Sequence, residues 1–354
     1  MKVFFDIKHL YYLPQYLPVK VALTSKGIEC HFVLYKQPDL QEVMIKYVEQ
    51  ENLNYTFVED SNEARDFYQI EKPTWIVFGD YVKNIEQLHQ HSKTALIQHG
   101  IGPKAYFDSS LSNATVRFVE GQYRLKKLQQ RFPNNNFVDT GYAKLDPIIN
   151  HSYSCISLTD LGLNPQKKTI LYAPTFYPSS IECLAKDWPS DLDNYNIIIK
   201  PHFFSLYKKK LKNHQKCFSH WQKCSNVYMA DLNDVSIIPF MTISDILISD
   251  ASSTMLEFTA LNKPAIWTDF YKLRWSYRGI LSYRYKKRIG VEIEFFAKVA
   301  EQVTCYKDML TAIDDVIQHP QKKETQRLEM KDLLVGKVDG KVSQRIAEYL
   351  ISTG

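Results

Sequence analysis

The chain has 354 residues, of which 45% are hydrophobic and 23% charged, a balance typical of a folded globular protein long enough for two domains. Its formal net charge of +5 is mildly basic. This charge lies well below the density of a dedicated nucleic-acid-binding protein, so we expect no nucleic-acid partner. Anionic small molecules or an anionic membrane surface match it better.

The start of the chain predicts a cytoplasmic protein. Residues 1–18 interrupt their short apolar stretch with Asp6, Lys8 and two prolines, unlike a signal peptide. No apolar run in the sequence approaches the ~18 residues of a membrane span. The six cysteines are scattered, without a Cys-x-x-Cys pair. Such a pattern is typical of reduced thiols, and we expect neither a bound metal nor another cofactor.

Short apolar segments alternate with longer amphipathic stretches through residues 1–150. Strands are predicted at residues 2–5, 30–35, 55–59, 74–80, 94–100, 115–121 and 136–142. Strands that alternate with helices indicate βαβ units and a mostly parallel sheet. Between residues 150 and 168 the pattern lapses into a polar stretch with Gly162 and Pro165, which predicts a linker.

The alternation resumes after the linker. Strands are predicted at residues 169–175, 195–202, 226–231, 245–250 and 264–267, with a helical stretch at 204–223. The sequence therefore predicts an α/β protein of two Rossmann-like domains that face a cleft. We expect an N-terminal domain at 1–150, a C-terminal domain at 151–321 and a tail at 322–354. One or two helices of the tail, within 322–351, are expected to pack back on the domains.

A group of polar residues follows the predicted strand 245–250. Open α/β sheets bind ligands where the carboxyl ends of strands meet the next helices. Ser252, Ser253 and Thr254 stand at such a junction, after Asp250, and free helix N–H groups there favour a phosphate. Glu257 shares a helix face with Ser253, where a carboxylate can accept hydrogen bonds from ribose hydroxyls. The alternative is a capping arrangement in which the hydroxyls bind helix N–H groups and Glu257 is solvated.

Two histidines also lie at predicted strand ends. His99 closes the strand 94–100 and precedes Gly100 and Lys104, while His202 closes the strand 195–202 close to Lys200. A lone histidine is more often structural than catalytic. Two at strand ends in different domains, each near a lysine, favour a shared chemical role.

Four segments carry a family resemblance. They are "QHGIGPK" from residue 98, "ILYAPTF" from 170, "IKPHF" from 199 and "ISDASSTMLEFTALNKPAIW" from 248. Together they resemble the CDP-glycerol glycerophosphotransferase family of teichoic-acid primases and polymerases and their capsule-forming relatives. The resemblance implies a GT-B fold whose C-terminal domain holds a CDP-alcohol. It also implies transfer of an alditol phosphate to the hydroxyl of a glycan or lipid-linked acceptor without a metal.

The resemblance also assigns residues. His99 matches the histidine of the family's His-Gly element, and His202 matches its second essential histidine. We predict that His99 is the base for the acceptor hydroxyl and that His202 stabilises the donor phosphates. The predicted donor-binding residues are Gly100, Lys104, Thr175, Lys200, Asp250, Ser252, Ser253, Thr254 and Glu257.

Some positions depart from the family's pattern. "TFYPSS" follows the Ala-Pro element where the family often has an arginine, and Phe203 follows His202 where a proline is usual. Ala143 and Lys144 replace a common Pro-Arg pair. These departures leave the donor alcohol and the acceptor open. The alternatives are a nucleotide-sugar glycosyltransferase, a sugar-nucleotide 2-epimerase, or a non-catalytic scaffold of envelope assembly that binds no nucleotide.

A basic run suggests a membrane partner. Residues 283–290, "YRYKKRIG", place Arg284, Lys286, Lys287 and Arg288 among tyrosines. Basic residues near an anionic leaflet contribute about 1 kcal/mol each to binding. A solvated loop is the default interpretation of such a run, and peripheral contact with the inner face of the cell membrane is the alternative.

Overall fold

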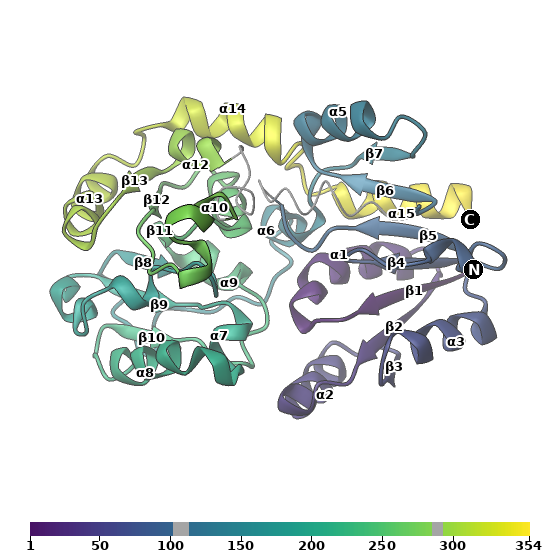
Figure 1. Ribbon diagram of the computed structural model, residues 1–354, viewed down its shortest axis with the longest axis horizontal. Coiled ribbons are helices and arrows are strands. Elements are labelled where there is room, and N and C mark those ends of the chain that lie inside the picture. Colours follow the sequence, from purple (N-terminus) through teal and green to yellow (C-terminus); the bar gives the residue numbers. More distant parts are fainter. Residues whose placement is uncertain (102–112, 285–292) are drawn as a thin grey trace. The chain divides into compact units, whose positions relative to one another are not determined.

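The computed structural model describes residues 1–101, 113–284 and 293–354, which form two compact units (Figure 1). Unit 1 contains residues 1–101, 113–152 and 332–354, and unit 2 contains residues 153–284 and 293–331. The predicted linker at 150–168 contains the boundary between residues 152 and 153. The structure divides residues 322–354 between the two units, whereas the sequence pattern set them apart as one tail.

Unit 1 is built on a seven-stranded sheet in the order β3-β2-β1-β4-β5-β6-β7, and every neighbouring pair is parallel. Its central strands are apolar and buried because helices cover both faces. The strands are β1 (Lys2–Ile7), β2 (Glu29–Tyr35), β3 (Tyr55–Val58), β4 (Trp75–Phe78), β5 (Lys93–Ile97), β6 (Val116–Val119) and β7 (Phe137–Asp139). The helices are α1 (Leu13–Thr24), α2 (Gln41–Gln50), α3 (Ser61–Glu71), α5 (Gly121–Arg131), α6 (Asp146–Ile149) and α15 (Val342–Thr353).

Unit 2 repeats this plan with six parallel strands in the order β10-β9-β8-β11-β12-β13. The strands are β8 (Thr169–Tyr172), β9 (Asn196–Ile199), β10 (Val227–Met229), β11 (Ile246–Ser249), β12 (Ala265–Thr268) and β13 (Glu301–Val303). The helices are α7 (Phe203–Tyr207), α8 (Lys212–Trp221), α9 (Ile238–Ile243), α10 (Ser253–Thr259), α12 (Glu294–Val299), α13 (Tyr306–Gln318) and α14 (Glu324–Leu334). Among the described residues, no helix has the length and apolar character needed to cross a membrane.

The sequence predicts every strand of both sheets except β13. This edge strand has three residues, of which Glu301 and Gln302 are polar, so it lacks the apolar run that marks the others. The single helical stretch predicted at 204–223 is wrong in one respect. The backbone of Lys208 is extended, which separates α7 from α8.

The helix α15 belongs to unit 1 and packs against α1. A helix of the tail therefore packs back on a domain, as predicted. The indole N–H of Trp75 donates to the carbonyl of Leu350 at 2.9 Å. The carboxylate of Asp146 accepts the N–H of Ser343 at 2.7 Å. The strand β4 and the helix α15 are therefore joined within unit 1, although 275 residues separate Trp75 from Leu350.

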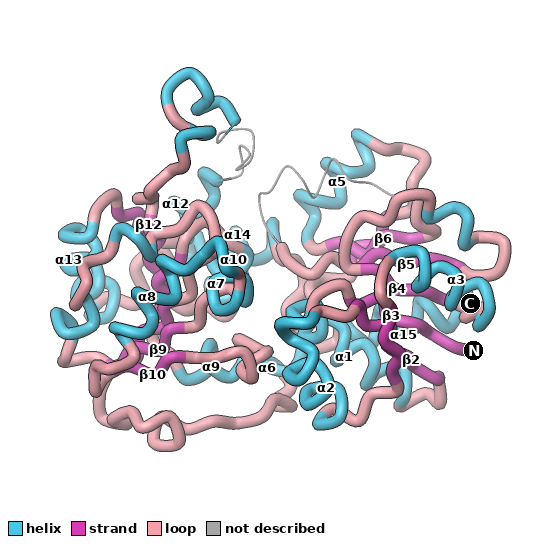
Figure 2. The backbone as a smooth tube through the Cα atoms, turned by 60° about the horizontal axis from the view of Figure 1, so that its bottom comes forward, coloured by secondary structure: helices cyan, strands magenta, loops and turns pink. Residues whose placement is uncertain are grey.

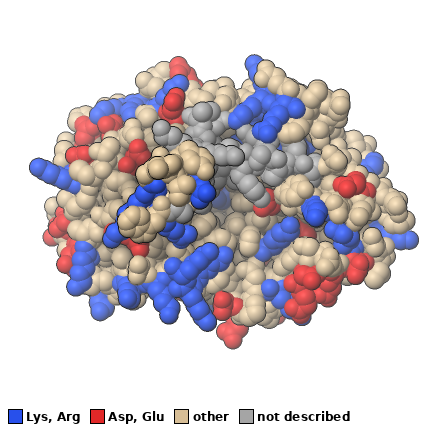
Figure 3. Space-filling model, in the orientation of Figure 1, with Lys and Arg blue, Asp and Glu red and all other residues tan. Residues whose placement is uncertain are grey.

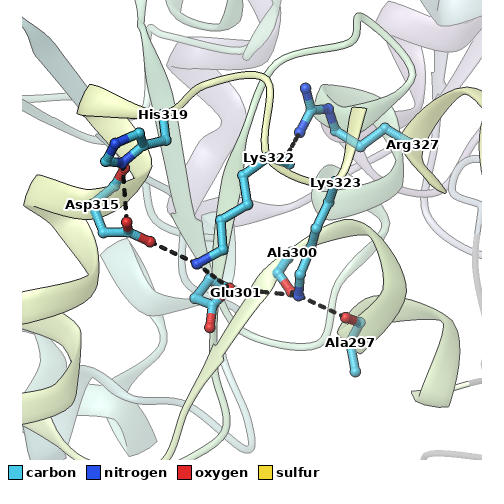
Figure 4. A network of polar contacts seen from close by, with 8 residues as sticks. All are labelled: Ala297, Ala300, Glu301, Asp315, His319, Lys322, Lys323 and Arg327. Carbon is cyan, nitrogen blue, oxygen red and sulfur yellow. Dashed lines mark hydrogen bonds and ion pairs between the residues drawn. The ribbon is translucent and has the colours of Figure 1, made fainter. Parts of the chain in front are cut away.

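The start of α14 is held in unit 2 by basic side chains (Figure 4). Lys323 Nζ donates to the carbonyls of Ala297 and Ala300 at 2.9 and 2.6 Å, at the end of α12. The buried Arg327 donates to the carbonyl of Lys322 at 2.6 Å, within the turn that precedes α14. The boundary between the two units lies further along α14, between residues 331 and 332.

Candidate active site

His99 lies just beyond β5, at the carboxyl edge of the sheet of unit 1. Its Nδ1 atom is 2.9 Å from the carbonyl oxygen of Gly79. Because a carbonyl only accepts hydrogen bonds, Nδ1 carries the proton, and the lone pair of the neutral imidazole lies on Nε2. The ring of Tyr12 stacks on the imidazole, with centroids 4.5 Å apart and planes 12° apart. His99 is therefore fixed in orientation with Nε2 as its basic atom.

Gly79 allows this arrangement because it lacks a side chain. A Cβ atom at this position would lie 2.5 Å from the hydroxyl of Tyr16 and 2.7 Å from the ring of Tyr12. Tyr12, Tyr16 and Gly79 are not among the residues that the sequence predicts for the site. The signal available was the aromatic pair Tyr11-Tyr12, which follows the carboxyl end of β1 after three residues, at the same sheet edge as His99.

The other predicted residues of this region have different positions. Gly100 is buried next to His99, whose own carbonyl accepts the hydroxyl of Tyr142 at 3.0 Å. The predicted donor ligand Lys104 lies outside the described residues.

His202 caps the first turn of α7 in unit 2. Its Nδ1 accepts the backbone N–H of Phe204 at 3.1 Å. The neutral imidazole therefore carries its proton on Nε2, the reverse of His99. Phe176 and Phe204 flank the ring, each with its centroid 4.8 Å away. In their neutral forms the two histidines thus carry their protons on opposite nitrogens, Nδ1 in His99 and Nε2 in His202.

Lys200 lies two residues before His202. Thr175 follows the neighbouring strand β8, and the backbone N–H of His202 donates to the carbonyl of the adjacent Pro174 at 3.2 Å. The Lys200 side chain is buried, with its ammonium 5.2 Å from the ring centroid of Phe203. Thr175 is buried as well, and its backbone N–H donates to Asp250 Oδ2 at 2.9 Å.

The predicted phosphate-binding residues lie at the start of α10. Ser252 is the N-cap, but its side chain makes no capping hydrogen bond. Its hydroxyl lies 3.1 Å from Ser249 Oγ, which itself donates to the carbonyl of Ala173. Ser252, Ser253 and Thr254 are all half-buried. The capping alternative is therefore wrong for Ser252, whose side chain leaves the N–H groups of the first turn to other acceptors.

Glu257 lies one turn further along α10 and is fully buried. The solvated position that the capping alternative required is therefore excluded. A buried carboxylate is retained in a fold only where polar or cationic groups compensate for the lost water. Its position on the same helix as the serines is the one that the sequence predicted.

The contacts of Asp250 differ from the predicted ones, in which its side chain binds the CDP-donor directly. Its side chain is fully buried, and its carboxylate binds the loop 174–180 and the end of β12. It accepts hydrogen bonds from Thr175 N, Ser179 Oγ, Ser180 N and Thr268 Oγ1 at 2.8 to 3.1 Å. The carboxylate thus holds the loop 174–180 in place beside α10.

The burial of the Asp250 carboxylate makes the stability of the fold depend on pH. Loss of water raises its pKa from 3.8 to about 6, against the opposing effect of hydrogen bonds from Ser180 and Thr268. Because the folded protein binds this proton more tightly than the unfolded chain, Asp250 stabilises the fold most below pH 4. This contribution falls by about 2–3 kcal/mol as the pH rises to 6, and then stays constant. Asp250→Asn lacks this pH-dependent contribution. The free energy of unfolding measured in urea should therefore be higher for the wild type than for the variant, by a margin that is larger at pH 4 than at pH 7. A difference that does not change with pH would contradict the assignment.

Comparison with known proteins gives this site its context. The sequence model of the CDP-Glycerol:Poly(glycerophosphate) glycerophosphotransferase family matches residues 43–352. The chain belongs to this family. All the predicted site residues lie within the match, whereas Tyr12 and Tyr16 precede it. The aromatic rings that pack beside His99 therefore lie outside the part of the chain that the family model matches.

Two curated proteins are similar to part of the chain. The teichoic acid glycerol-phosphate primase of Bacillus subtilis (strain 168) is 28% identical over 156 residues, which is 42% of this chain. The teichoic acid poly(glycerol phosphate) polymerase of Bacillus spizizenii is 27% identical over 154 residues. The alignments cover 37% and 36% of the lengths of these relatives.

Solved structures support the fold. The wall teichoic acid polymerase TagF superposes with a TM-score of 0.68 and 16% identity, over 100% of this chain and 88% of that one. The UDP-GlcNAc 2-epimerase of Neisseria meningitidis superposes with a TM-score of 0.63 and 15% identity, over 99% of this chain and 100% of that one. At these identities the likeness establishes the GT-B fold alone.

Proposed function

We propose that the protein transfers glycerol phosphate, or another alditol phosphate, from a CDP-activated donor to an acceptor hydroxyl. The product belongs to a cell-surface polymer such as teichoic acid, capsule or a related glycan. The observation that carries this proposal is the opposite protonation of two histidines in a glycerophosphotransferase family member. In the neutral forms, the Nδ1 partners leave the lone pair of His99 and the N–H of His202 on Nε2.

The chemistry follows from these tautomers. The acceptor oxygen attacks the phosphorus that carries the alditol, and the bond from that phosphorus to the oxygen of CMP breaks. The proton of the acceptor hydroxyl passes to His99 Nε2, a contribution of about 10²–10⁴-fold to the rate. Negative charge grows on the CMP oxygen and is stabilised by His202 Nε2–H and the N–H groups at the start of α10. The same groups hold the donor phosphates in the ground state.

The charge of the protein suits such a substrate. On the face shown in Figure 3, basic side chains cover more of the surface than acidic ones, in keeping with the net charge of +5. The acceptor in this proposal is a glycan or lipid-linked molecule. Peripheral contact with the inner face of the membrane would bring the protein to a lipid-linked acceptor. Most of the basic run 283–290 predicted for that contact lies outside the described residues.

A sugar-nucleotide 2-epimerase is the second candidate, because the epimerase of Neisseria meningitidis shares the whole fold. The match of the glycerophosphotransferase model over residues 43–352 favours the transferase. The two functions require different nucleotides, since the epimerase acts on UDP-GlcNAc and the proposed transferase on a CDP-alditol.

Thermal unfolding with nucleotides tests the proposed function. CDP-glycerol at about 100 times its Kd should stabilise the protein by ~2.7 kcal/mol and raise its Tm, whereas UDP-GlcNAc should not. The double variant Ser252→Ala/Ser253→Ala should need a higher concentration of CDP-glycerol for the same shift. Its Tm without ligand should fall only slightly, because the Ser252 side chain makes no capping hydrogen bond and both side chains are only half-buried.

The matched control is Ser219→Ala, on the exposed face of α8 in the same unit. It should respond to CDP-glycerol like the wild type. A shift with UDP-GlcNAc alone would favour the epimerase, and no shift with either nucleotide would favour the scaffold. An unchanged affinity in the double serine variant, measured by calorimetry, would remove both serines from the donor site.

A further inference from the structure

The segment of unit 2 that contains β9, α7, α8 and β10 has no acidic side chain. Residues 194–230 include neither Asp nor Glu, although roughly one residue in nine of the whole chain is acidic, 39 of 354. The same residues include no arginine, so lysine is their only cationic residue apart from histidine. Five of the lysines lie close together in the sequence, and we call them the lysine strip: Lys208, Lys209, Lys210, Lys212 and Lys216.

The lysine strip is exposed and lacks negative partners. Lys208 is half-buried, and the other four lysines are exposed. Among the residues that the structure describes, none of the five forms an ion pair. Lys212 and Lys216 lie one turn apart on α8, where like charges repel each other. Burial and the repulsion by Lys210 lower the pKa of the Lys208 ammonium. A bound anion would relieve this repulsion.

The lysine strip begins beside His202. The centroid of the Phe204 ring lies 4.8 Å from that of the His202 imidazole, and the ammonium of Lys208 lies 3.3 Å from the centroid of the same Phe204 ring. The strip continues through the 3₁₀ helix Lys209–Leu211 into α8, which packs against the edge strand β10 (Figure 2). Figure 3 shows a dense group of basic side chains in the region of α7. One end of the strip thus lies next to the histidine that we propose to contact the donor phosphates.

The composition of this surface indicates the class of its partner. Within residues 194–230, all of which the structure describes, no large hydrophobic side chain is exposed. The surface therefore lacks the aromatic rings on which bases stack and the apolar anchors that enter a bilayer. Lysine is a compact charge on a flexible stem, which suits phosphates that have no fixed geometry. These properties favour a flexible chain with a phosphate in each repeat over a nucleic acid or a membrane.

We propose that the lysine strip binds a phosphodiester chain, in which alditols are joined through phosphates, and holds several phosphates at once. This chain is the polymer that the proposed reaction extends, so the inference rests on the proposed function. Lys208 contacts the phosphate nearest to His202, and Lys212 and Lys216 contact phosphates further along the chain. Because the contacts are electrostatic and multivalent, affinity should rise with the number of repeats and fall with salt.

Fluorescence anisotropy with a labelled poly(glycerol phosphate) oligomer tests the inference with the full chain. The wild type should bind the oligomer much more tightly than it binds glycerol 3-phosphate. The double variant Lys209→Gln/Lys210→Gln should bind the oligomer about 10-fold more weakly and with a smaller dependence on salt, because two phosphate contacts are lost. Lys208 is left unchanged, since it packs on Phe204 beside His202.

The matched control is Lys26→Gln/Lys72→Gln, which removes two charges from exposed positions of unit 1. It should bind the oligomer like the wild type. Three results would overturn the inference: wild-type protein that does not bind the oligomer, a Lys209→Gln/Lys210→Gln variant that binds it normally, or an equal loss in the control. If that variant instead loses affinity only for vesicles of phosphatidylglycerol and phosphatidylcholine, the lysine strip binds lipid and not the polymer.

The thermal response to CDP-glycerol separates this inference from the proposed function. Both double variants should keep the wild-type Tm and its rise with CDP-glycerol, because neither changes a residue of the candidate active site. Stabilisation by CDP-glycerol without binding of the oligomer would refute the role of the lysine strip and leave the transferase standing. Binding of the oligomer without any response to CDP-glycerol would contradict the transferase instead.

Discussion

His99→Ala should lower turnover at least ~10²-fold and leave the affinity for the CDP-alditol donor nearly unchanged. A base that removes the acceptor's proton acts mainly in the transition state, so its loss affects kcat rather than donor binding. The ring also packs on Tyr12, and its removal alters the local structure. A second variant is therefore needed to separate the chemical role from the structural one.

His99→Asn supplies that control. The side-chain amide is a donor in place of Nδ1–H toward the carbonyl of Gly79, but asparagine has no basic atom. Both variants should lose turnover to a similar extent. Their affinity for the donor, measured by calorimetry, should stay nearly unchanged. If His99→Ala retains near-normal turnover, or if its only defect is weaker donor binding, the base lies elsewhere and His202 is the next residue to test.

His202→Ala should weaken both donor binding and turnover, each by about 10–10²-fold, because a hydrogen bond to a charged phosphate is lost in the ground state and in the transition state. The alanine also removes the acceptor for the N–H of Phe204, at a cost of ~1 kcal/mol to the stability of α7. These two effects must be measured apart, by kinetics and by thermal unfolding.

His202→Asn separates them. Asparagine is a preferred N-cap residue, and its Oδ1 can accept the N–H of Phe204 as Nδ1 does. It lacks the Nε2–H that the donor phosphates require. The asparagine variant should therefore keep wild-type stability and show the same kinetic defect as alanine. Normal donor affinity in this variant would reduce His202 to a capping residue.

The parallel sheets could be predicted from sequence because their strands are buried on both faces and therefore stand out as apolar runs. The positions of the two histidines followed from the same pattern, since each comes directly after such a run. Their tautomers could not be predicted. The tautomer of His99 depends on the carbonyl of Gly79, twenty residues earlier. The tautomer of His202 depends on the N–H of Phe204, which is in position to donate only once α7 has formed.

The contacts of Asp250 could not be predicted from its position at the end of a strand. Its position after β11 is the same as that of a ligand-binding residue, so sequence alone favoured contact with the donor. The partners that occupy its carboxylate come from residues 175 to 180, more than 69 positions earlier, and from Thr268 on the next strand. A local pattern carries no information about such contacts. The packing of Tyr12 beside Gly79 could not be predicted for the same reason.

The packing of α15 has a consequence for synthesis on the ribosome. The indole of Trp75 and the carboxylate of Asp146 are made early, but their partners Leu350 and Ser343 emerge only after the whole of unit 2. Residues 153–331 separate the two parts of unit 1, which at 5–20 residues per second is a delay of roughly 10–35 s. The unit that is translated first is thus the last to be completed. Nascent chains should expose the uncovered surface of unit 1 to chaperones throughout that interval.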